Sequence, residues 1–384
     1  MTTKPDYLVV DCDGHVLEPF ALWEEYVEPS FRQRVDQVLR VVNTETSCMW
    51  ILEGFGGFAE GALHRAGAFK PGLDYQESGR LAETPKKWGP EYLTPGGFDP
   101  HERIKDMDEL GIDAAMLYPT TLAMLGGISD PAVANALARA YNRWVADYCE
   151  PYPDRLFAAA VVPIQSTELA VAELQRVAKL GFKAVVVRPN LVNGQPLHSP
   201  TLHPFWEACQ EMGITIGMHP FPTPDMPGSW EFLAKTGLAI GESLCFPIDS
   251  MTALADLMFS GLLDQFPRLK VGILESDCGW ITMLLERSDK RFEMMKPLFP
   301  DIKTRPTELF HRHCYIAFEG GEVAVARFAD ILEDRAVWSS DYPHQDAEPP
   351  QEAFENFEKH KLDPAIQAKL MGINAIRMYG LPLG

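Results

Sequence analysis

The sequence predicts an α/β protein built as a single (β/α)8 TIM barrel with a long insertion after its first strand. Eight short apolar segments rich in Val, Ile, Leu and Ala each precede a longer segment with helical periodicity, which is typical of βα units. The apolar segments lack an alternating polar face, so their strands should be buried on both sides of a parallel sheet. No glycine-rich phosphate loop follows the first of them, and this favours a closed barrel over an open dinucleotide-binding sheet.

The predicted elements alternate along the whole chain. The strands are 7–11, 114–118, 157–163, 184–188, 215–219, 270–275, 314–318 and 336–339. The helices lie near 100–110, 131–149, 167–180, 201–213, 248–266, 279–295, 322–333 and 351–378. Gly111, Gly181 and Gly213 precede strands two, four and five, where a left-handed cap should end each helix. Pro267 should end the helix before strand six.

Residues 1–384 therefore form one barrel domain, and residues 19–98 form an insertion between the first strand and its helix. Within the insertion, 38–42 and 48–52 are predicted to pair as a hairpin, while 54–72 and 84–97 are rich in Gly and Pro. Because the insertion leaves the carboxyl end of a barrel strand, we expect it to lie over the catalytic face as a lid. The alternative is a peripheral excursion that contributes to a subunit contact.

Composition excludes several classes of protein. The chain has 34 Lys+Arg against 54 Asp+Glu, a net charge of −20, which disfavours nucleic acid and anionic membranes as partners. The start of the chain lacks the apolar core of a secretory signal, and no apolar run is long enough to span a bilayer. Seven cysteines are scattered singly without a CxxC pair. This pattern predicts reduced thiols and a cytoplasmic location.

Polar side chains follow the predicted strands, at the end where the active sites of such barrels are built. They are Asp11, Asp13 and His15 after strand one, Arg188 after strand four, His219 after strand five, Glu275 and Asp277 after strand six, Glu319 after strand seven, and Ser340, Asp341 and His344 after strand eight. Asp13 and His15 are two residues apart, so on an extended segment they share a face. A carboxylate and imidazoles that converge on one point suit Zn²⁺, Mn²⁺ or Fe²⁺.

Five motifs in the sequence resemble one known family. They are DCDGHVLEP at 11–19, GMHP at 217–220, LESDCGW at 274–280, SSDYPH at 339–344 and GINAIRMYG at 372–380. Together they look like the amidohydrolase-related branch of the metal-dependent amidohydrolase superfamily, the branch that contains aminocarboxymuconate semialdehyde decarboxylase. The resemblance implies a metal site in which Asp13 and His15 are the first-strand pair, His219 is the fifth-strand ligand, and Asp341 is a ligand that also handles a proton.

The sequence departs from this family pattern in two places. The decarboxylases generally carry an acid/base His at the sixth strand, where this chain has Glu275. The lysine that is carbamylated in binuclear members is not evident at the end of strand four, where Arg188 stands. Arg188 has two open interpretations, a bidentate partner of a substrate carboxylate or a member of an internal salt bridge.

Glu275 and His344 allow a second metal position. With Asp13, His15, His219 and Asp341 they supply three carboxylates and three imidazoles, and three carboxylates carry more charge than one divalent ion neutralises. We therefore expect one or two divalent ions per chain, the second position being only partly occupied. In the alternative interpretation, Glu275 orients a metal-bound His and His344 is a loop residue. Aromatic residues of the insertion, Trp23, Trp50, Phe55 and Phe58, and also His64, are candidates to line the pocket; the alternative is that most of them form the core of the lid.

These observations predict a metal-dependent hydrolase or non-oxidative decarboxylase that acts on a small carboxylated or amide-bearing organic molecule. The catalytic candidates are Asp341, Glu275, His344 and Arg188. A non-haem di-iron or di-manganese oxygenase on the same barrel is the first alternative, and a non-catalytic partner subunit of an active homologue is the second. The aromatic-rich insertion predicts a homodimer or larger oligomer, and a hetero-oligomer with a paralogue is compatible with the same sequence.

Overall fold

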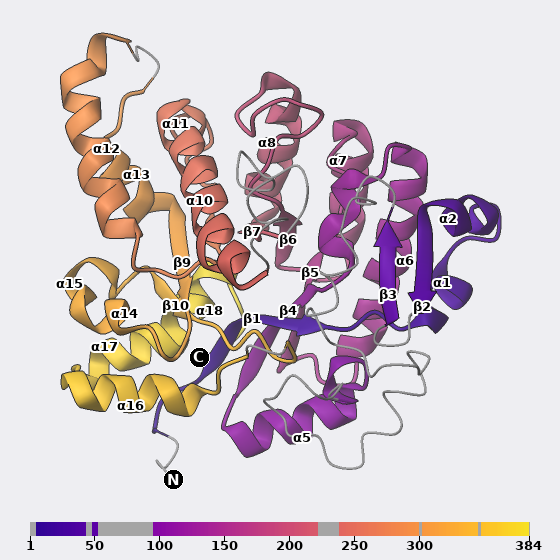
Figure 1. Ribbon diagram of the computed structural model, residues 1–384, viewed down its shortest axis with the longest axis horizontal. Helices are drawn as coiled ribbons and strands as arrows, with labels where there is room; N and C mark the ends of the chain where they lie inside the picture. The colour runs from indigo at the N-terminus through magenta and orange to yellow at the C-terminus, as the bar shows by residue number, and fades with distance from the viewer. Residues whose placement is uncertain are drawn as a thin grey trace.

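The computed structural model describes residues 5–43, 48–52, 95–221, 238–298, 302–344 and 347–383. Eight parallel strands form one sheet in chain order, with helices around it (Figure 1). The strands are β1 (Val10–Val16), β4 (Ala114–Pro119), β5 (Leu156–Ala160), β6 (Ala184–Val187), β7 (Thr215–Met218), β8 (Val271–Ile273), β9 (Cys314–Phe318) and β10 (Ala336–Trp338). This arrangement confirms the predicted (β/α)8 barrel.

The barrel closes between its first and last strands. Just beyond β10, the Asp341 amide donates a hydrogen bond to the Asp13 carbonyl at 3.1 Å, and the His15 amide donates to the Tyr342 carbonyl at 2.7 Å. The buried Asp11 carboxylate adds a side-chain tie, because it accepts from the Ser340 amide at 3.0 Å and from the Ser340 hydroxyl at 2.6 Å. These bonds fix β1 and the segment after β10 relative to each other.

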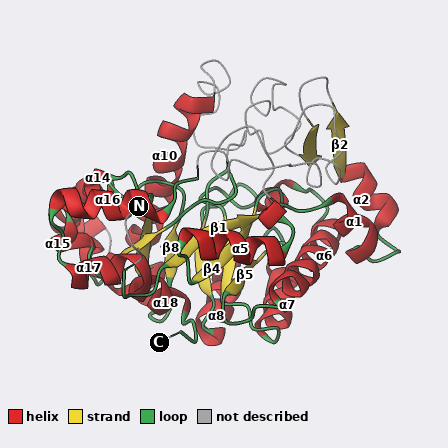
Figure 2. Cartoon of the chain, turned by 90° about the horizontal axis from the view of Figure 1, so that it is seen from below, coloured by secondary structure: helices red, strands yellow, loops and turns green. Residues whose placement is uncertain are grey.

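Helices lie around the sheet, as Figure 1 shows, and Figure 2 gives a second view of them. They are α5 (Pro100–Leu110), α6 (Pro131–Cys149), α7 (Thr167–Ala178), α8 (His203–Met212), α10 (Leu238–Phe259), α11 (Leu262–Gln265), α12 (Ile281–Met295), α13 (Pro306–His313), α14 (Val323–Arg327) and α15 (Ala329–Leu332). Gly111, Gly181 and Gly213 have φ values of 80°, 91° and 66°. Gly111 and Gly213 are the expected left-handed caps of α5 and α8, whereas α7 ends at Lys179 in the right-handed region and Gly181 lies beyond that cap.

The prediction of one continuous helix near 351–378 is wrong. The structure has α16 (Pro350–His360), α17 (Pro364–Ala368), a π-helical turn η5 (Lys369–Ile373) and α18 (Asn374–Tyr379). Lys361 adopts the left-handed region with φ 54° and ends α16, and Pro364 starts α17. The helix expected from residue 248 instead begins at Leu238 and carries Pro247 in its interior.

Alternate residues of the strands fill the barrel interior. Ala114, Met116 and Tyr118 of β4 belong to the inner cluster, whereas Ala115 and Leu117 pack toward the helices. Helix α18 closes the amino-terminal end of the barrel, since the Tyr379 hydroxyl donates to the Cys12 carbonyl at 2.7 Å. The interior is therefore packed at this end, and polar side chains gather at the other.

Strand β1 differs from its prediction, because it covers Val10–Val16 instead of 7–11. Asp13 and His15 consequently lie within the strand and not beyond it. Val10 and Cys12 face the barrel interior, so strict alternation would turn His15 away from the centre. The register of β1 against β4 shifts between Asp11 and Gly14, and this irregularity changes which side chains face inward.

The start of the predicted insertion is described in part. It contains α1 (Phe20–Tyr26), α2 (Arg32–Val38) and an antiparallel pair, β2 (Leu39–Asn43) and β3 (Cys48–Leu52). The hairpin expectation is thus confirmed. Strand β3 lies beside η2 (Leu122–Gly127), the turn that follows β4. Residues 53–94, which include Phe55, Phe58 and His64, lie outside the described residues, so the lid remains a prediction.

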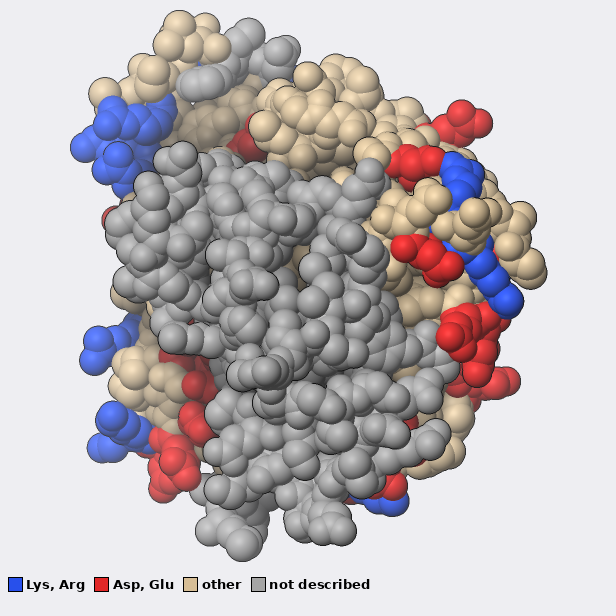
Figure 3. All heavy atoms as spheres, turned by 45° about the vertical axis from the view of Figure 1, so that its right-hand side comes forward, with Lys and Arg blue, Asp and Glu red and all other residues tan. Residues whose placement is uncertain are grey.

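The surface agrees with the charge balance of the sequence. On the face shown in Figure 3, the described Lys and Arg side chains stand in separate groups with Asp and Glu between them. No helix in the described ranges has the length and apolar character needed to cross a membrane. Six cysteines in the described ranges are free thiols: Cys12, Cys149, Cys209, Cys245, Cys278 and Cys314.

Candidate metal centre

Side chains from three places in the barrel meet at the carboxyl ends of the strands. Asp13 and His15 come from β1, His219 directly follows β7, and each offers a ligand atom within 4.8 Å of the others. A second group shares His15 and adds Asp341 and His344, which follow β10. The four residues Asp13, His15, His219 and Asp341 are 1–4% exposed. The four residues expected to hold one metal ion therefore fall into two overlapping groups that share His15.

The two histidine rings are oriented by the backbone. The Nδ1 atom of His15 lies 3.3 Å from the Pro119 carbonyl oxygen, and that of His219 lies 2.7 Å from the Pro220 carbonyl oxygen. Because a carbonyl only accepts, each Nδ1 must carry the proton. The two Nε2 atoms then hold lone pairs, and they lie 3.2 Å apart. Two facing lone pairs at this distance fit a cation between them.

The titration behaviour of these groups agrees with a cation site. Burial, with the His344 imidazole beside it, lowers the pKa of His15 to about 4. Burial, with His15 beside it, lowers the pKa of His219 to about 3, so both rings are neutral as metal ligands require. Burial and the neighbouring carboxylates of Asp341, Asp11 and Glu319 raise the pKa of Asp13 well above its usual value. Among the described residues, Asp13 Oδ1 is buried without a hydrogen-bond partner. The donor set thus fits a divalent ion.

Asp341 and His344 form a close pair at the edge of the centre. His344 Nδ1 lies 2.8 Å from Asp341 Oδ1, and His15 Nε2 lies 3.1 Å from the same oxygen. Although burial opposes it, contact with His344 and His15 lowers the pKa of Asp341. Asp341 has a left-handed backbone with φ 55°, which turns its carboxylate toward the histidines.

Thr120 fixes the other side of His344. Its hydroxyl donates to the Val16 carbonyl at 2.9 Å and lies 3.0 Å from His344 Nε2. Since the single hydroxyl proton is used on Val16, the ring nitrogen must donate to Thr120 Oγ1. His344 is therefore held by hydrogen bonds at both ring nitrogens.

Two further carboxylates face the centre. Glu275 Oε2 lies 3.2 Å from His219 Nε2, and a backbone φ of 42° at Glu275 directs the segment after β8 toward the barrel axis. Glu319 follows β9 and is not among the catalytic or metal-binding residues that the sequence predicts. Burial and the charge of Asp341, followed by other acidic neighbours, raise its pKa to about 9. The mouth of the barrel thus crowds carboxyl groups together, and a metal ion would offset the repulsion between their ionised forms.

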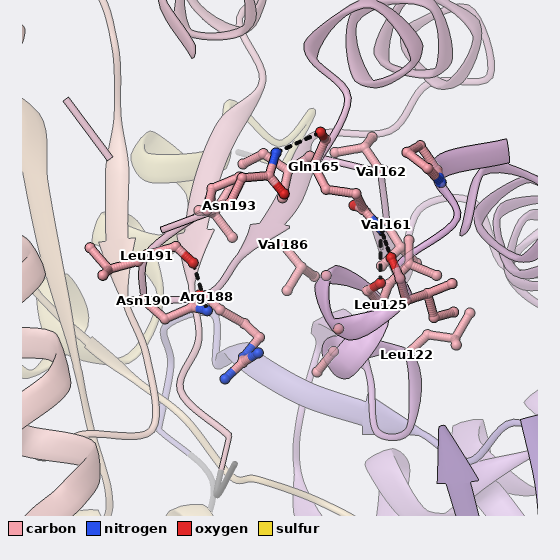
Figure 4. Close-up of a pocket in the computed structure, with 18 of the residues that line it drawn as sticks. Leu122, Leu125, Val161, Val162, Gln165, Val186, Arg188, Asn190, Leu191 and Asn193 are labelled. Atoms are coloured by element: carbon pink, nitrogen blue, oxygen red, sulfur yellow. Dashed lines mark hydrogen bonds between the residues drawn. The ribbon is translucent and has the colours of Figure 1, made fainter. Parts of the chain in front are cut away.

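Arg188 lines a cavity of about 460 Å³ beside the centre. The cavity lies between the segments that follow β4, β5 and β6, and its walls include Leu122, Leu125, Val162 and Val186. Figure 4 shows the Arg188 guanidinium at one end of this ring of side chains and the Gln165 amide at the other. Arg188 is buried and so places a cation in a pocket that both apolar and polar side chains line.

Two polar residues near the centre are not predicted from the sequence. Thr120 and Gln165 follow β4 and β5, so the strand-end rule reaches both positions, but neither residue type is distinctive for chemistry. Of the insertion residues, Trp23 is buried in α1, and the side chain of Trp50 lies outside the description. His198 Nδ1 lies 2.5 Å from Asp256 Oδ1, and this pair is not part of the metal centre.

Comparisons with known proteins agree on one group. A family model described as "Amidohydrolase" matches residues 10–381. The chain is 28% identical over 265 residues to gamma-resorcylate decarboxylase of Polaromonas sp. (strain JS666), covering 66% of this chain and 80% of that protein. It is 24% identical over 291 residues to 2-amino-3-carboxymuconate-6-semialdehyde decarboxylase of Dictyostelium discoideum, covering 74% and 77%.

A solved structure shares the fold. The dihydroxybenzoic acid decarboxylase of Polaromonas sp. JS666, determined with bound manganese and the inhibitor 2-nitroresorcinol, superimposes with a TM-score of 0.66 at 21% identity. The match covers 98% of each chain. The likeness therefore extends over the whole barrel.

Proposed function

This chain belongs to the amidohydrolase family, and on that basis we propose that it is a metal-dependent decarboxylase of a small aromatic carboxylate. The observation that carries the proposal is the pair of facing Nε2 atoms of His15 and His219, 3.2 Å apart beside the orphaned Asp13 Oδ1. The curated relatives named above are decarboxylases, which favours this chemistry over hydrolysis.

Asp13, His15, His219 and Asp341 would hold the ion, which we expect to be Mn²⁺, Zn²⁺ or Fe²⁺. When bound, such an ion polarises substrate oxygens and offsets the negative charge at the barrel mouth. The backbone carbonyls of Pro119 and Pro220 keep both imidazoles in the tautomer that leaves Nε2 unprotonated. Ligand orientation is thus built into the last residue of β4 and the segment that follows β7.

Decarboxylation needs an anchor for the substrate and a proton source. We assign Arg188, which lines the cavity beside the centre, to pair with a substrate carboxylate. When the bond from the ring carbon to the carboxyl carbon breaks, carbon dioxide leaves and its bonding electron pair stays on the ring carbon. That carbon must take up a proton, and Glu275, beside His219 at the edge of the centre, is the acid we assign to this transfer.

The experiment is carbon dioxide release from 2,6-dihydroxybenzoate and related benzoates by Mn²⁺-loaded protein. Glu275→Gln should lower kcat by about a hundred-fold or more, the usual size of a lost general acid. Arg188→Lys should mainly raise KM, because it loses bidentate geometry but keeps the charge. Release of a hydrolysis product instead, with Asp341 acting as the base, would replace the proposal by the hydrolase alternative.

Metal content separates the remaining alternatives. The group formed by His15, Asp341 and His344 is the observation that favours a second metal position. Because both nitrogens of His344 already have partners, we expect about one tightly bound ion per chain and no dioxygen consumption after anaerobic loading with Fe²⁺. Two ions per chain, lost in His344→Ala and accompanied by dioxygen uptake, would establish the oxygenase. If the isolated chain binds its metal ion but shows no activity, the result would favour the role of a partner subunit.

Assembly is a separate proposal. We expect a homodimer or larger oligomer, as the aromatic insertion suggests. Light scattering at micromolar concentration tests it, and a mass near the 42.9 kDa of one chain would contradict it.

A further inference from the structure

Helix α5 places one cation against the backbone of the metal centre. Arg103 lies near the start of this helix and is 1% exposed. Its Nη1 donates to the His15 carbonyl at 2.9 Å, so the guanidinium holds the backbone of a residue whose imidazole faces the centre. Since a buried charge destabilises the fold unless it is paired and hydrogen-bonded, the partners of Arg103 decide whether it is tolerated here.

Asp11 supplies the opposite charge. Its Oδ2 lies 4.0 Å from Arg103 Nη2, and both side chains are buried. The same carboxylate accepts from the Asp13 amide at 3.2 Å and from both the amide and the hydroxyl of Ser340. Asp13 is itself a proposed ligand, and Ser340 precedes another, Asp341. The ion pair thus connects Arg103 to both segments that carry the anionic ligands.

Helix α5 also holds the segment after β10 at Tyr342. The Arg103 guanidinium carbon lies 4.3 Å from the centre of the Tyr342 ring, a geometry in which a cation is attracted to the ring face. One turn further along α5, the Asp106 carboxylate accepts a hydrogen bond from the Tyr342 hydroxyl. The Tyr342 carbonyl in turn accepts from the His15 amide at 2.7 Å. Arg103 therefore contacts residues on both sides of the barrel closure.

Gly14 leaves room for this cation between two ligands of the chain. A Cβ on Gly14 would lie 2.5 Å from Arg103 Nη2 and 2.7 Å from Asp11 Oδ2, well inside the separation of about 3.5–4.0 Å at which non-bonded atoms pack. The glycine between Asp13 and His15 therefore lets the guanidinium lie directly against β1. It does so where the register of the strand shifts, so the irregular part of β1 that carries both ligands is packed on Arg103.

We propose that Arg103 is a positioning residue for the metal centre, which fixes Asp13 and His15 relative to Asp341. The metal site belongs to the proposed function, and this inference rests on it. Ligands already held in place bind an ion without reordering the backbone, so Arg103 contributes preorganisation. Loss of the guanidinium would leave Asp11 buried without this countercharge and the His15 carbonyl without this donor. The two ligand-bearing segments would then be free to move apart.

Mn²⁺ affinity tests the proposal without reference to turnover. Arg103→Met removes the charge and the donors but keeps a long side chain, and Arg103→Lys keeps the charge and an ammonium donor. Free Mn²⁺ is measured by electron paramagnetic resonance during titration of protein that circular dichroism shows to be folded. We expect the dissociation constant to rise by about ten-fold or more in Arg103→Met and the spectrum of the bound ion to change. Arg103→Lys should recover most of the affinity.

Arg155→Met is the matched control. Arg155 also donates to backbone carbonyls, those of Asp113 and Ile112 at 2.8 Å each. It directly precedes β5 and so lies at the amino end of the barrel, opposite the centre. Its loss should lower the free energy of unfolding and leave the Mn²⁺ dissociation constant unchanged. A merely structural role for Arg103 would give the same result in both Met variants.

An unchanged Mn²⁺ dissociation constant in folded Arg103→Met overturns the proposal, and so does an equal rise in Arg155→Met. If Arg103→Met does not fold, Arg103→Gln, which keeps an amide donor but not the charge, is expected to show the rise, and an unchanged constant overturns the proposal. Parent protein that binds no Mn²⁺ overturns the metal centre and this inference together. Carbon dioxide release is scored separately: its absence from a parent that binds Mn²⁺ would overturn the decarboxylase proposal alone.

Discussion

The Nε2 atoms of His15 and His219 lie 3.2 Å apart, although both rings direct their protonated nitrogen to a backbone carbonyl on the opposite side. In neutral rings neither Nε2 can donate to the other, so the pair is repulsive until a cation or a proton lies between them. Asp13, with Oδ2 at 3.7 Å from His219 Nε2, completes a set of neutral and anionic ligands. We therefore expect a metal ion at this point to contribute to the stability of the fold as well as to its chemistry.

Metal binding should accordingly raise thermal stability. Because the ion binds the folded chain and not the unfolded one, saturating Mn²⁺ is expected to raise the Tm of metal-free parent protein by several degrees. His219→Ala should lose most of this shift, while His101→Ala, an exposed residue of α5 that contacts Tyr152, should keep it. Calorimetry with and without Mn²⁺ measures the effect, and equal shifts in both variants would rule out His219 as a ligand.

Thr120 should act through His344. Thr120→Val removes the acceptor for His344 Nε2 and frees the ring to turn, so kcat is expected to fall by about ten-fold or more with a smaller change in KM. Thr120→Ser restores the hydroxyl and should recover most of kcat. Steady-state kinetics of the two variants give the comparison. If the Ser variant is as slow as the Val variant, the hydroxyl has no part in positioning His344.

We expect the fold beneath the metal centre to require a glycine at Gly217. A Cβ at this position would lie 2.3 Å from the Tyr118 hydroxyl oxygen, and the Tyr118 ring stacks with His219 at a centroid distance of 5.8 Å. Gly217→Ala is therefore expected to destabilise the fold by about 1–3 kcal/mol and to weaken Mn²⁺ binding.

Gly126→Ala is the matched control for Gly217→Ala, since a Cβ at Gly126 meets nothing within 4 Å. Denaturant unfolding and metal titration of both variants provide the measurement. Similar losses in the two variants would show that close packing under His219 is not the cause.

His313 should make stability depend on pH. Its side chain is buried with Nδ1 at 2.8 Å from the Leu269 carbonyl, and burial, only partly offset by this hydrogen bond, lowers the pKa of His313 below its ordinary value of 6.5. As the pH falls below 6.5, the unfolded chain takes up a proton at this residue more readily than the folded chain does. The contribution of His313 to stability is thus present above pH 6.5 and is lost as the pH falls through the lowered folded value.

His313→Asn tests this pH dependence, because its amide can still donate to Leu269 but does not titrate. Between pH 7.5 and 5 the unfolding free energy should fall less steeply in the variant than in the parent. Parallel pH profiles would contradict the assignment.

Much of this architecture follows from local sequence. Each βα unit carries its own apolar segment and helical period, so all eight strands of the barrel were located, with errors of a few residues at their ends. The longest error, the helix at 351–378, arose because a continuous helical period does not show the left-handed break at Lys361. The strand-end rule identified Asp13, His15, His219 and Asp341, since parallel strands bring their carboxyl ends together whatever lies between them.

Local sequence is enough to predict the barrel, the face that carries the chemistry and the residue types of a metal centre, because these depend on periodicity and on the order of the strands. The directions in which those side chains point depend on contacts between distant segments. The register shift between Asp11 and Gly14 turns His15 inward, Thr120 and His344 meet across 224 positions of the chain, and Gln165 is oriented by carbonyls of a different loop. Hydrogen bonds of this kind form between segments that only the closed barrel brings within 3 to 3.5 Å, so no local pattern in the sequence records them.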